Sequence, residues 1–401
     1  MKILVVSQYF WPEVFRINDF VLELIKRGHE VSVLTGNPNY PKGRFLPGYG
    51  FKYQVEYYNG IKIYRVPILP RRNSNFMLIL NYISFVLSGC FFALFHNIRY
   101  DKIVAVNYSP ITSAYPAIVC KKRKNTQLLL WVQDLWPESV RAASPVKYGI
   151  VDKFLLVMVK NIYKNSDKIV VSNSGFSESI LAKGVPENKI SFIPNWAEDL
   201  YENENQIYPE KYRSLMPEGF KVMFAGNIGE AQDFDSIIEA AMLTKYNENI
   251  KWIVIGDGRK KIWLEQEIEK RQLSSTFYVL GRYPLEEMPS FFIHADLLLA
   301  SLKNEYIFSL TIPAKVQSYM AFGKPIVTML TGAGNRIIND ANCGFAGESS
   351  DFRKLAENVI FASSLSKTKL AEMGQKGEKY YQEYFAKNLA IDNFVKTLNK
   401  K

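Results

Sequence analysis

The sequence predicts an α/β protein with two doubly wound parallel sheets, one in each of two domains. A chain of 401 residues is longer than one ordinary hydrophobic core requires. Short apolar runs with strand character alternate with helical patterns in two separate series, which is typical of parallel sheets covered by helices. A polar segment without periodicity, which contains Pro209 and Pro217, separates the two series.

The first series predicts a Rossmann-like N-terminal domain of residues 1–197. It begins with a strand at 3–6, so we do not expect a signal peptide there, and continues with a helix at about 16–27 that ends at Gly28. Further strands are expected at 31–34, 61–66, 103–106, 128–132, 168–172 and 190–193.

The second series predicts a Rossmann-like domain of residues 198–379, followed by a helical tail. The tail, at about 380–401, is long enough to cross back onto the first domain, and we expect the two domains to face each other across a cleft. Strands of this series are expected at 221–225, 252–255, 277–280, 297–300 and 326–329.

Charge and cysteine content narrow the classes of function. Residues 1–195 contain 25 Lys and Arg against 12 Asp and Glu, a net charge of +13, whereas residues 196–401 contain 25 against 27, a net charge of −2. The basic half indicates an anionic partner such as an acidic lipid surface; nucleic acid fits less well, because the cations lack interleaved aromatic residues. Three widely spaced cysteines and three histidines argue against a disulfide framework and a metal site.

An uncharged apolar segment at 73–97 is long enough to suggest a membrane-spanning helix. Strands of one sheet are expected both before and after it, so a span would separate them across the bilayer. The helix would also carry a narrow polar stripe of Asn81, Ser84 and Ser88.

We therefore expect an interfacial helix at about 75–97 that lies on anionic headgroups. A buried core helix and a true membrane span are the alternatives. Replacing Phe85 and Phe92 with glutamate is expected to abolish membrane association. Arginines flank the helix at positions 71, 72 and 99.

The first phosphate-binding candidate follows the expected strand at 221–225. Gly226 and Gly229 lack the Cβ atoms that would keep a diphosphate at a distance, and an amphipathic helix follows them. Asn227 and Gln232 belong to the same turn. A tight strand-to-helix connection without a ligand is the alternative.

Lys315 is the second phosphate-binding candidate. The run at 311–325 reads as a helix with Thr311 as its N-cap and Pro313 in its first turn. The helix dipole disfavours a lysine in the first turn unless an anion binds there, so we predict that Lys315 is a phosphate ligand. A lysine extended into solvent is the alternative. Arg282, directly after an expected strand, is another cation at a strand end.

With these motifs the chain resembles, over nearly its whole length, the retaining glycosyltransferases of family 4, which have the GT-B fold. The first-domain motifs are similar to a subgroup that builds bacterial O-antigen and capsular polysaccharides and includes L-fucosamine (FucNAc) transferases. The first-domain motifs are Arg27-Gly28-His29-Glu30-Val31, Pro38-Asn39-Tyr40-Pro41 and Asp134-Leu135-Trp136-Pro137-Glu138. The second-domain motifs are Gly226-Asn227-Ile228-Gly229 with Gln232, Val254-Ile255-Gly256-Asp257-Gly258, Gly281-Arg282, and Pro313-Ala314-Lys315 through Gly323-Lys324-Pro325.

The resemblance implies a nucleotide diphosphate-sugar donor, usually a UDP-sugar, on the second domain and an acceptor on the first. It also implies retention of configuration and neither a metal nor another cofactor, so that helix N-termini and cations stabilise the leaving diphosphate. Carried over to this sequence, the resemblance places the phosphates near Gly226, Asn227, Gly229 and Gln232, where Thr311 and Lys315 hold them. It places the base beside Arg282 and Tyr283. Arg16 and Asn18 stand where the family has its glycine-rich loop.

One departure concerns the donor sugar. Many family members carry two glutamates eight residues apart, which hold sugar and ribose hydroxyls. Here Leu310 and Ser318 stand at those positions, which leaves Ser318 as a donor-site candidate without a carboxylate.

Asp134 is the expected catalytic carboxylate, with Glu138 in the same loop as a substitute. Asp134 follows the apolar run at 128–132, where it could orient the acceptor hydroxyl or accept its proton. Capping of the turn before Pro137 is the alternative role.

The predicted function is transfer of a sugar, for example an N-acetylated deoxyhexosamine such as L-FucNAc, from a UDP-sugar to an undecaprenyl-diphosphate-linked saccharide. This reaction would serve O-antigen, lipopolysaccharide or capsule biosynthesis on the cytoplasmic face of the bacterial cell membrane. A sugar-nucleotide epimerase of the same fold, or a catalytically dead membrane-associated scaffold, are the alternatives. A dehydrogenase is disfavoured because no Gly-x-Gly-x-x-Gly follows a strand.

Overall fold

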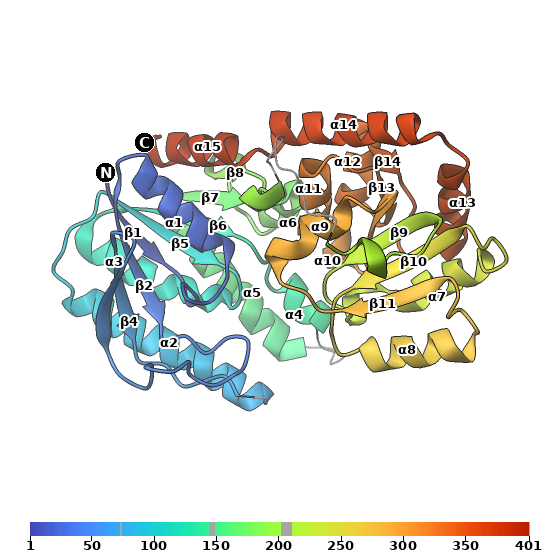
Figure 1. Ribbon diagram of the computed structural model, residues 1–401. Coiled ribbons are helices and arrows are strands. Elements are labelled where there is room, and N and C mark those ends of the chain that lie inside the picture. The colour runs from blue at the N-terminus through green and yellow to red at the C-terminus, as the bar shows by residue number, and fades with distance from the viewer. Residues whose placement is uncertain (73, 144–148, 202–210, 401) are drawn as a thin grey trace. The chain divides into compact units, whose positions relative to one another are not determined.

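The computed structural model describes residues 1–72, 74–143, 149–201 and 211–400, which form two compact units (Figure 1). Unit 1 comprises Met1–Ser172, Phe176–Ile193 and Ile391–Lys401. Unit 2 comprises Asn173–Gly175 and Pro194–Ala390. The end of the chain therefore returns to unit 1, as the sequence predicts.

Unit 1 contains an eight-stranded sheet with the order β3-β4-β2-β1-β5-β6-β7-β8. Its central strand is parallel to both neighbours, with Val5 opposite Val33 on one side and Val104 on the other. These strands are apolar throughout because helices cover both faces of the sheet. The strands are β1 (Lys2–Val6), β2 (Glu30–Gly36), β3 (Gln54–Tyr58), β4 (Ile61–Val66), β5 (Lys102–Asn107), β6 (Gln127–Val132), β7 (Lys168–Val171) and β8 (Ile190–Phe192).

The edge strand β3 departs from the predicted parallel pattern. It pairs antiparallel with β4 through a tight hairpin at Asn59 and Gly60. Both turn residues have positive φ, 47° and 82°, which suits the twist of a two-residue hairpin. Val55 and Tyr57 are exposed on this edge, so the strand lacks the continuous apolar run by which the other strands were recognised.

Helices cover both faces of this sheet. The step from β1 to β2 and the step from β5 to β6 move in opposite directions across it, so right-handed crossovers place α1 and α3 on opposite faces. Helix α15 joins α1, because Phe394 packs against Phe20 and Trp131 at ring distances of 4.5 and 5.2 Å. The helices of unit 1 are α1 (Arg16–Lys26), α2 (Asn75–Phe95), α3 (Tyr115–Lys124), α4 (Glu138–Ala143), α5 (Gly149–Asn165), α6 (Ser174–Ala182) and α15 (Lys387–Asn399).

Unit 2 contains a parallel six-stranded sheet with the order β11-β10-β9-β12-β13-β14. Five of its strands lie where the sequence predicts them, and the two-residue strand β14 is an addition at the edge. The strands are β9 (Phe220–Ala225), β10 (Ile250–Ile255), β11 (Phe277–Gly281), β12 (Leu297–Ser301), β13 (Ile326–Met329) and β14 (Gly344–Phe345).

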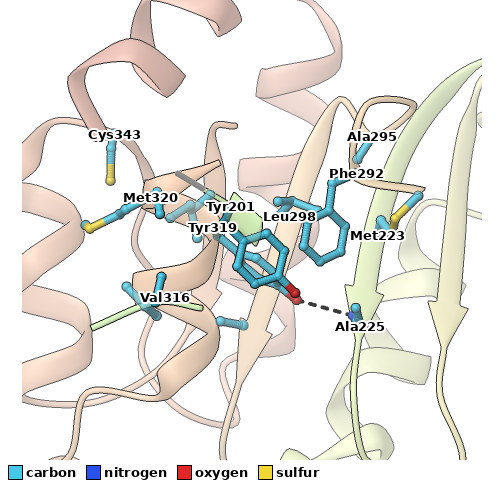
Figure 2. Close-up of a cluster of buried hydrophobic side chains, with 14 of the residues drawn as sticks. Tyr201, Met223, Ala225, Phe292, Ala295, Leu298, Val316, Tyr319, Met320 and Cys343 are labelled. Atoms are coloured by element: carbon cyan, nitrogen blue, oxygen red, sulfur yellow. Dashed lines mark hydrogen bonds between the residues drawn. The ribbon is translucent and has the colours of Figure 1, made fainter. Parts of the chain in front are cut away.

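One core cluster of unit 2 joins α11 to strand β9 (Figure 2). Tyr319 of α11 is buried, and its hydroxyl oxygen accepts a hydrogen bond from the backbone N–H of Ala225 at 3.2 Å. This bond fixes the helix against the last residue of β9. The helices of unit 2 are α7 (Phe234–Leu243), α8 (Lys261–Lys270), α9 (Met288–Phe292), α10 (Tyr306–Ser309), α11 (Ala314–Ala321), α12 (Ala333–Ala341), α13 (Phe352–Ser363) and α14 (Lys367–Tyr384).

The C-terminal tail consists of two helices instead of the single one expected. Helix α14 ends at Tyr384 and α15 begins at Lys387. Phe385, between them, is buried in the core of unit 2, whereas Phe394 is buried in unit 1. The break therefore lies where the chain leaves one core for the other.

Candidate functional site

The carboxyl edge of the unit 2 sheet carries the glycine turns predicted for the donor phosphates. The strand order reverses between β9 and β12, and ligands of doubly wound sheets bind at such a switch point. Gly226 follows β9 directly, Gly256 follows β10, and Lys303 lies just beyond β12. Because all these strands are parallel, their ends lie on one edge.

Gly226 and Lys315 are in direct contact, although they lie far apart in the sequence. A Cβ atom on Gly226 would lie 2.8 Å from Cε and 3.0 Å from Nζ of Lys315, and its φ of 141° disfavours other residues. The bond from Ala225 to Tyr319 holds the two segments together. The glycine thus makes room for the lysine, a reason that the motif alone does not reveal.

The ammonium group of Lys315 lacks a polar partner. It lies 3.3 Å from the centre of the Phe224 ring, and within the described residues it forms neither a hydrogen bond nor an ion pair. Burial lowers the pKa of Lys315 to about 7. The residue is in the first turn of α11, where the helix dipole adds to this cost. An anion bound here would relieve both penalties.

The glycine turn after β9 is closed by its own side chains. The Asn227 side-chain amide donates to Oε1 of Gln232 at 3.2 Å, directly above Gly229, where a Cβ atom would lie 2.3 Å from Asn227 Nδ2. The turn continues as a short 3₁₀ segment at Glu230–Gln232, and α7 begins only at Phe234. Three of the four predicted residues of this turn are therefore adjacent, and Gly226 is next to them in the chain.

The prediction that Thr311 caps α11 is wrong. Pro313 is the N-cap of α11, and the Thr311 hydroxyl instead donates to the carbonyls of Ile307 and Phe308 at 2.8 and 3.0 Å. It thereby closes the preceding short helix α10. The backbone of Thr311 still lies beside the site, because its carbonyl is 3.5 Å from where a Cβ atom of Gly334 would be.

Ser318 is paired with a carboxylate that sequence reasoning missed. Its hydroxyl lies 3.1 Å from Oε2 of Glu198 and 3.2 Å from the carbonyl of Ala314. Glu198 stands 120 residues earlier in the chain. It therefore brings a carboxylate to the helix position where the resemblance expects one and the sequence shows only serine.

The loop after β13 is a further element that the sequence analysis omitted. Gly332 has a φ of 74°, and a Cβ atom there would lie 2.2 Å from the Ser309 carbonyl. A Cβ atom on Gly334 would lie 2.9 Å from Leu330 and 3.3 Å from Pro313. These glycines, at the N-cap and in the first turn of α12, pack against the segment that leads into α11. Their spacing, Gly-Ala-Gly after a strand, was a usable signal.

Arg282 and Tyr283 follow β11, at the same edge of the sheet. Arg282 is exposed. Tyr283 packs its ring against Tyr212 and Phe291, at centroid distances of 5.2 and 4.6 Å. Its ring therefore already takes part in a hydrophobic cluster, and Arg282 is the more accessible of the two.

In unit 1, Asp134 lies just past the carboxyl end of β6. Its backbone carbonyl accepts a bond from the Asn107 side chain at 3.1 Å, and Oδ2 lies 3.3 Å from Nε1 of Trp136. Burial raises the pKa of Asp134, while the nearby hydroxyls of Ser139 and Ser109 and the Trp136 N–H oppose the rise. The carboxylate is thus held in a fixed position and accepts bonds from neighbouring side chains.

Glu138 has a structural partner instead of a free carboxylate. Its Oε1 accepts hydrogen bonds from Lys183 at 2.6 Å and Ser179 at 2.7 Å, and the side chains of the ion pair are only 7% and 11% exposed. This pair ties α4 to α6. To act as the substitute catalytic residue, Glu138 would have to give up its ion pair with Lys183.

Arg16 and Asn18 lie in the first turn of α1, not in a loop. Asn18 uses both ends of its amide, accepting from the Trp11 N–H at 3.1 Å and donating to the Glu13 carbonyl at 2.8 Å. Arg16 also has an interaction of its own. Both residues belong to unit 1, where Asn18 fixes the loop after β1.

Helix α2 is attached by its polar stripe and exposes its apolar face. Asn81 is fully buried, where it accepts from the Gln8 side chain at 2.7 Å and donates to the Leu69 carbonyl at 2.5 Å. Ser84 and Ser88 bond to the segment at 67–69. The opposite face exposes Phe76, Ile79, Ile83, Leu87, Phe91, Leu94 and Phe95. This is the reverse of a core helix, so that alternative is wrong.

Length and composition also set α2 apart. It alone among the helices of the described residues is long and apolar enough to cross a membrane, with 22% of its most apolar window buried.

Within the residues that the structure describes, no group of three or more His, Cys, Asp or Glu side chains could hold a metal ion.

Comparison with protein families gives two adjacent matches. Residues 15–196 match the glycosyl transferase 4-like domain, and residues 209–380 match the glycosyl transferases of group 1. The first match falls largely in unit 1 and the second in unit 2.

Individual relatives agree with these matches. WcaI of Escherichia coli K12, a glycosyl transferase named for colanic acid biosynthesis, is 26% identical over 340 residues, which are 80% of this chain and 82% of WcaI. The GPI3 component of the phosphatidylinositol N-acetylglucosaminyltransferase of Saccharomyces cerevisiae is 24% identical over 76% of this chain and 64% of its own length. A crystal structure of Alr3699/HepE from Anabaena, in complex with UDP and glucose, has a TM-score of 0.69 and 15% identity over the full length of both chains. This structural neighbour and the two family matches establish the GT-B fold for the chain.

Proposed function

We propose that this chain, which belongs to the glycosyltransferases and combines a 4-like domain with a group 1 domain, transfers a sugar from a UDP-sugar to a lipid-linked saccharide in the biosynthesis of a surface polysaccharide. The observation that carries the proposal is the unpaired Lys315 ammonium beside Gly226. Within the described residues this buried cation has no counterion, and its place at a strand end and a helix N-terminus suits a diphosphate.

The donor chemistry follows from these residues. Transfer breaks the bond between the anomeric carbon and the diphosphate oxygen and forms a bond from that carbon to the acceptor oxygen. Negative charge then grows on the leaving diphosphate. Lys315 and the N–H groups at the start of α11 and in the glycine turn offset this charge without a metal ion. The oxygens of Glu198 and Ser318 can accept hydrogen bonds from hydroxyls of the sugar nucleotide, in place of the glutamate that the resemblance expects.

The acceptor hydroxyl must lose a proton during transfer. We assign to Asp134 the role of accepting this proton or orienting the hydroxyl. Hydrogen bonds with Asn107 and Trp136 fix the position of Asp134. Retention of configuration is part of the proposal and follows from the resemblance.

The relatives support the class of substrate. The Alr3699/HepE structure contains UDP, which favours a UDP-sugar, and WcaI is named for a surface polysaccharide. The yeast relative is named for a lipid acceptor, phosphatidylinositol. With the exposed apolar face of α2, these names favour a lipid-linked acceptor and a peripheral position on the cytoplasmic face of the membrane. An N-acetylated deoxyhexosamine such as L-FucNAc remains our proposed donor sugar.

Calorimetric titration tests the donor site. UDP, GDP, ADP and NAD are titrated without metal and then with Mg²⁺. We expect UDP to bind without metal and Lys315→Ala to weaken it by about a hundredfold, the scale of one lost charge-assisted contact. Lys270→Ala is the matched control, because this lysine is 75% exposed at the far end of α8. Binding of NAD in preference to UDP, or no effect of the Lys315 variant, would overturn the assignment.

A further inference from the structure

We propose that four cations at the start of α2, Lys42, Arg44, Arg71 and Arg72, bind the diphosphate of the lipid-linked acceptor, whose lipid chain lies on the exposed face of α2. The inference rests on the proposed function and specifies its acceptor. It gives a role to the motif Pro38-Asn39-Tyr40-Pro41, which the donor chemistry leaves unexplained.

Three of the four cations line one open hollow. Lys42, Arg44 and Arg72, with Gly43, line a hollow of about 490 Å³ that contains no carboxylate among its lining residues. Within the described part of the chain none of the four cations forms an ion pair. By contrast, Arg123 near the other end of α2 is engaged, because it donates to the carbonyls of Ala93 and His96.

The loops that carry the cations are built into unit 1. The Arg72 N–H donates to the Gly43 carbonyl at 2.8 Å, and the Arg71 N–H donates to Asn39 Oδ1 at 3.1 Å. Asn39 is 1% exposed, and its own N–H donates to the buried Glu13 carboxylate at 2.8 Å. Arg72 has a φ of 43°, an uncommon value for a side chain of this size. The backbone that carries the cluster is therefore held by hydrogen bonds within unit 1.

The cluster reaches toward the candidate catalytic carboxylate. The Arg71 guanidinium lies 5.2 Å from the centre of the Tyr40 ring. Burial raises the pKa of Tyr82, on α2. The positive charge of Arg71 lowers this pKa and the negative charge of Asp134 raises it, so both charges lie near Tyr82. A saccharide attached to a diphosphate in the cluster would thus start from the neighbourhood of Asp134.

The adjoining helix suits the lipid part. Its apolar face begins at Phe76, immediately after the cluster, and the helix has 21 residues, about 30 Å in length, without a charge. A ligand with a strongly anionic head and a long apolar chain matches a cation cluster that is followed by an apolar helix face. Arginine pairs bidentately with phosphate, which favours a diphosphate over a singly charged headgroup.

The test uses the full chain and nanodiscs. Binding is measured to phosphatidylcholine nanodiscs that contain undecaprenyl diphosphate, and to discs in which phosphatidylglycerol supplies the same negative charge. We expect the wild type to prefer the undecaprenyl diphosphate discs by at least about tenfold. The triple variant Lys42→Gln, Arg44→Gln, Arg72→Gln should lose this preference and keep its UDP affinity. Retained UDP binding separates failure of this inference from failure of the donor site.

A matched control separates a site from general charge. The variant Lys122→Gln, Lys160→Gln, Lys164→Gln removes three positive charges from α3 and α5 of the same unit. We expect it to retain the preference. Equal binding to both kinds of disc by the wild type, or equal loss in both triple variants, would overturn the proposal in favour of nonspecific attraction to anionic membranes.

Discussion

Lys315 is a residue whose position costs stability. Its buried ammonium has a lowered pKa and no polar partner in the part of the chain that the structure describes, which destabilises the unliganded fold. Proteins tolerate such a cost mainly where a ligand compensates. Replacement by methionine, which keeps the apolar stem over Phe224, should raise the melting temperature of unit 2 by about 2–4 °C at pH 7. The same variant should lose UDP binding. Calorimetry and thermal denaturation measure both effects, and a variant that is less stable than the wild type would contradict the idea.

The pH dependence of UDP binding follows from the same lysine. In the free protein burial lowers the Lys315 pKa to about 7, and a bound diphosphate raises it again. Above pH 7 binding must therefore take up a proton, and UDP affinity should fall as the pH rises toward the pKa of the complex. Titrations at pH 8 in buffers of different ionisation enthalpy should reveal uptake of about one proton. Identical uptake in the Lys315→Met variant would show that another group is responsible.

Asp134 and Glu138 should respond differently to loss of charge. Asp134→Asn should lower kcat by about 10²–10⁴-fold with little effect on UDP affinity or melting temperature, because the amide can keep its place beside Trp136. Glu138→Gln breaks a buried pair with Lys183, so it should cost several kcal/mol of stability, about 3–5. Steady-state kinetics of both variants measure the change in kcat, and thermal denaturation measures the change in stability. A Glu138→Gln enzyme that is stable but inactive would reverse the two roles.

Sequence reasoning at this scale selected residues that carry a local signal. Gly226 and Lys315 each carried a local anomaly, a missing side chain after a strand and a cation in a first helical turn. Glu198 carried none, because its value arises only when the fold brings it to Ser318. Thr311 was misassigned because a threonine before a proline fits an N-cap and a C-terminal contact equally well in sequence. Their roles in binding stay predictions.

At the scale of elements, α2 shows why a pattern of hydrophobicity does not identify faces. The sequence correctly indicated a polar stripe, but not that the stripe is the attached side. Phe85, which the sequence suggested as a lipid contact, is 0% exposed, and Phe92 stacks on His96 at 4.4 Å. Gly89 also belongs to the packed face, since a Cβ atom there would lie 2.6 Å from Pro116. In a helix that is apolar on almost every side, only tertiary contacts separate the core face from the free one.

The free face of α2 gives a prediction for membrane association. Leu87 and Phe91 are each 66% exposed, so Leu87→Ser with Phe91→Ser should leave the fold intact. Loss of their burial in lipid should weaken vesicle binding by roughly tenfold or more. Sedimentation with phosphatidylglycerol vesicles measures this. Leu285→Ser, at an exposed leucine of unit 2, is the control, and unchanged binding of the double variant would refute an interfacial α2.

At the scale of the whole molecule, the two sheets were predictable because their strands are buried on both faces and appear as continuous apolar runs. The exceptions, β3 and β14, are an exposed edge strand and a two-residue strand, which such runs do not mark. The break in the C-terminal tail was also missed, because Phe385 and Phe394 look alike in sequence and differ only in the core that buries them.

That tail leads to a prediction about the cooperativity of unfolding. Phe394 of α15 is buried against Phe20 and Trp131, so Phe394→Ala should destabilise unit 1 by about 3–5 kcal/mol. UDP, bound by unit 2, should raise the melting temperature of unit 2 alone. Differential scanning calorimetry should then resolve two transitions in this variant, of which only the upper one moves with UDP. If both transitions shift together, the two cores unfold as one cooperative unit, and the chain that returns at α15 would be what couples them.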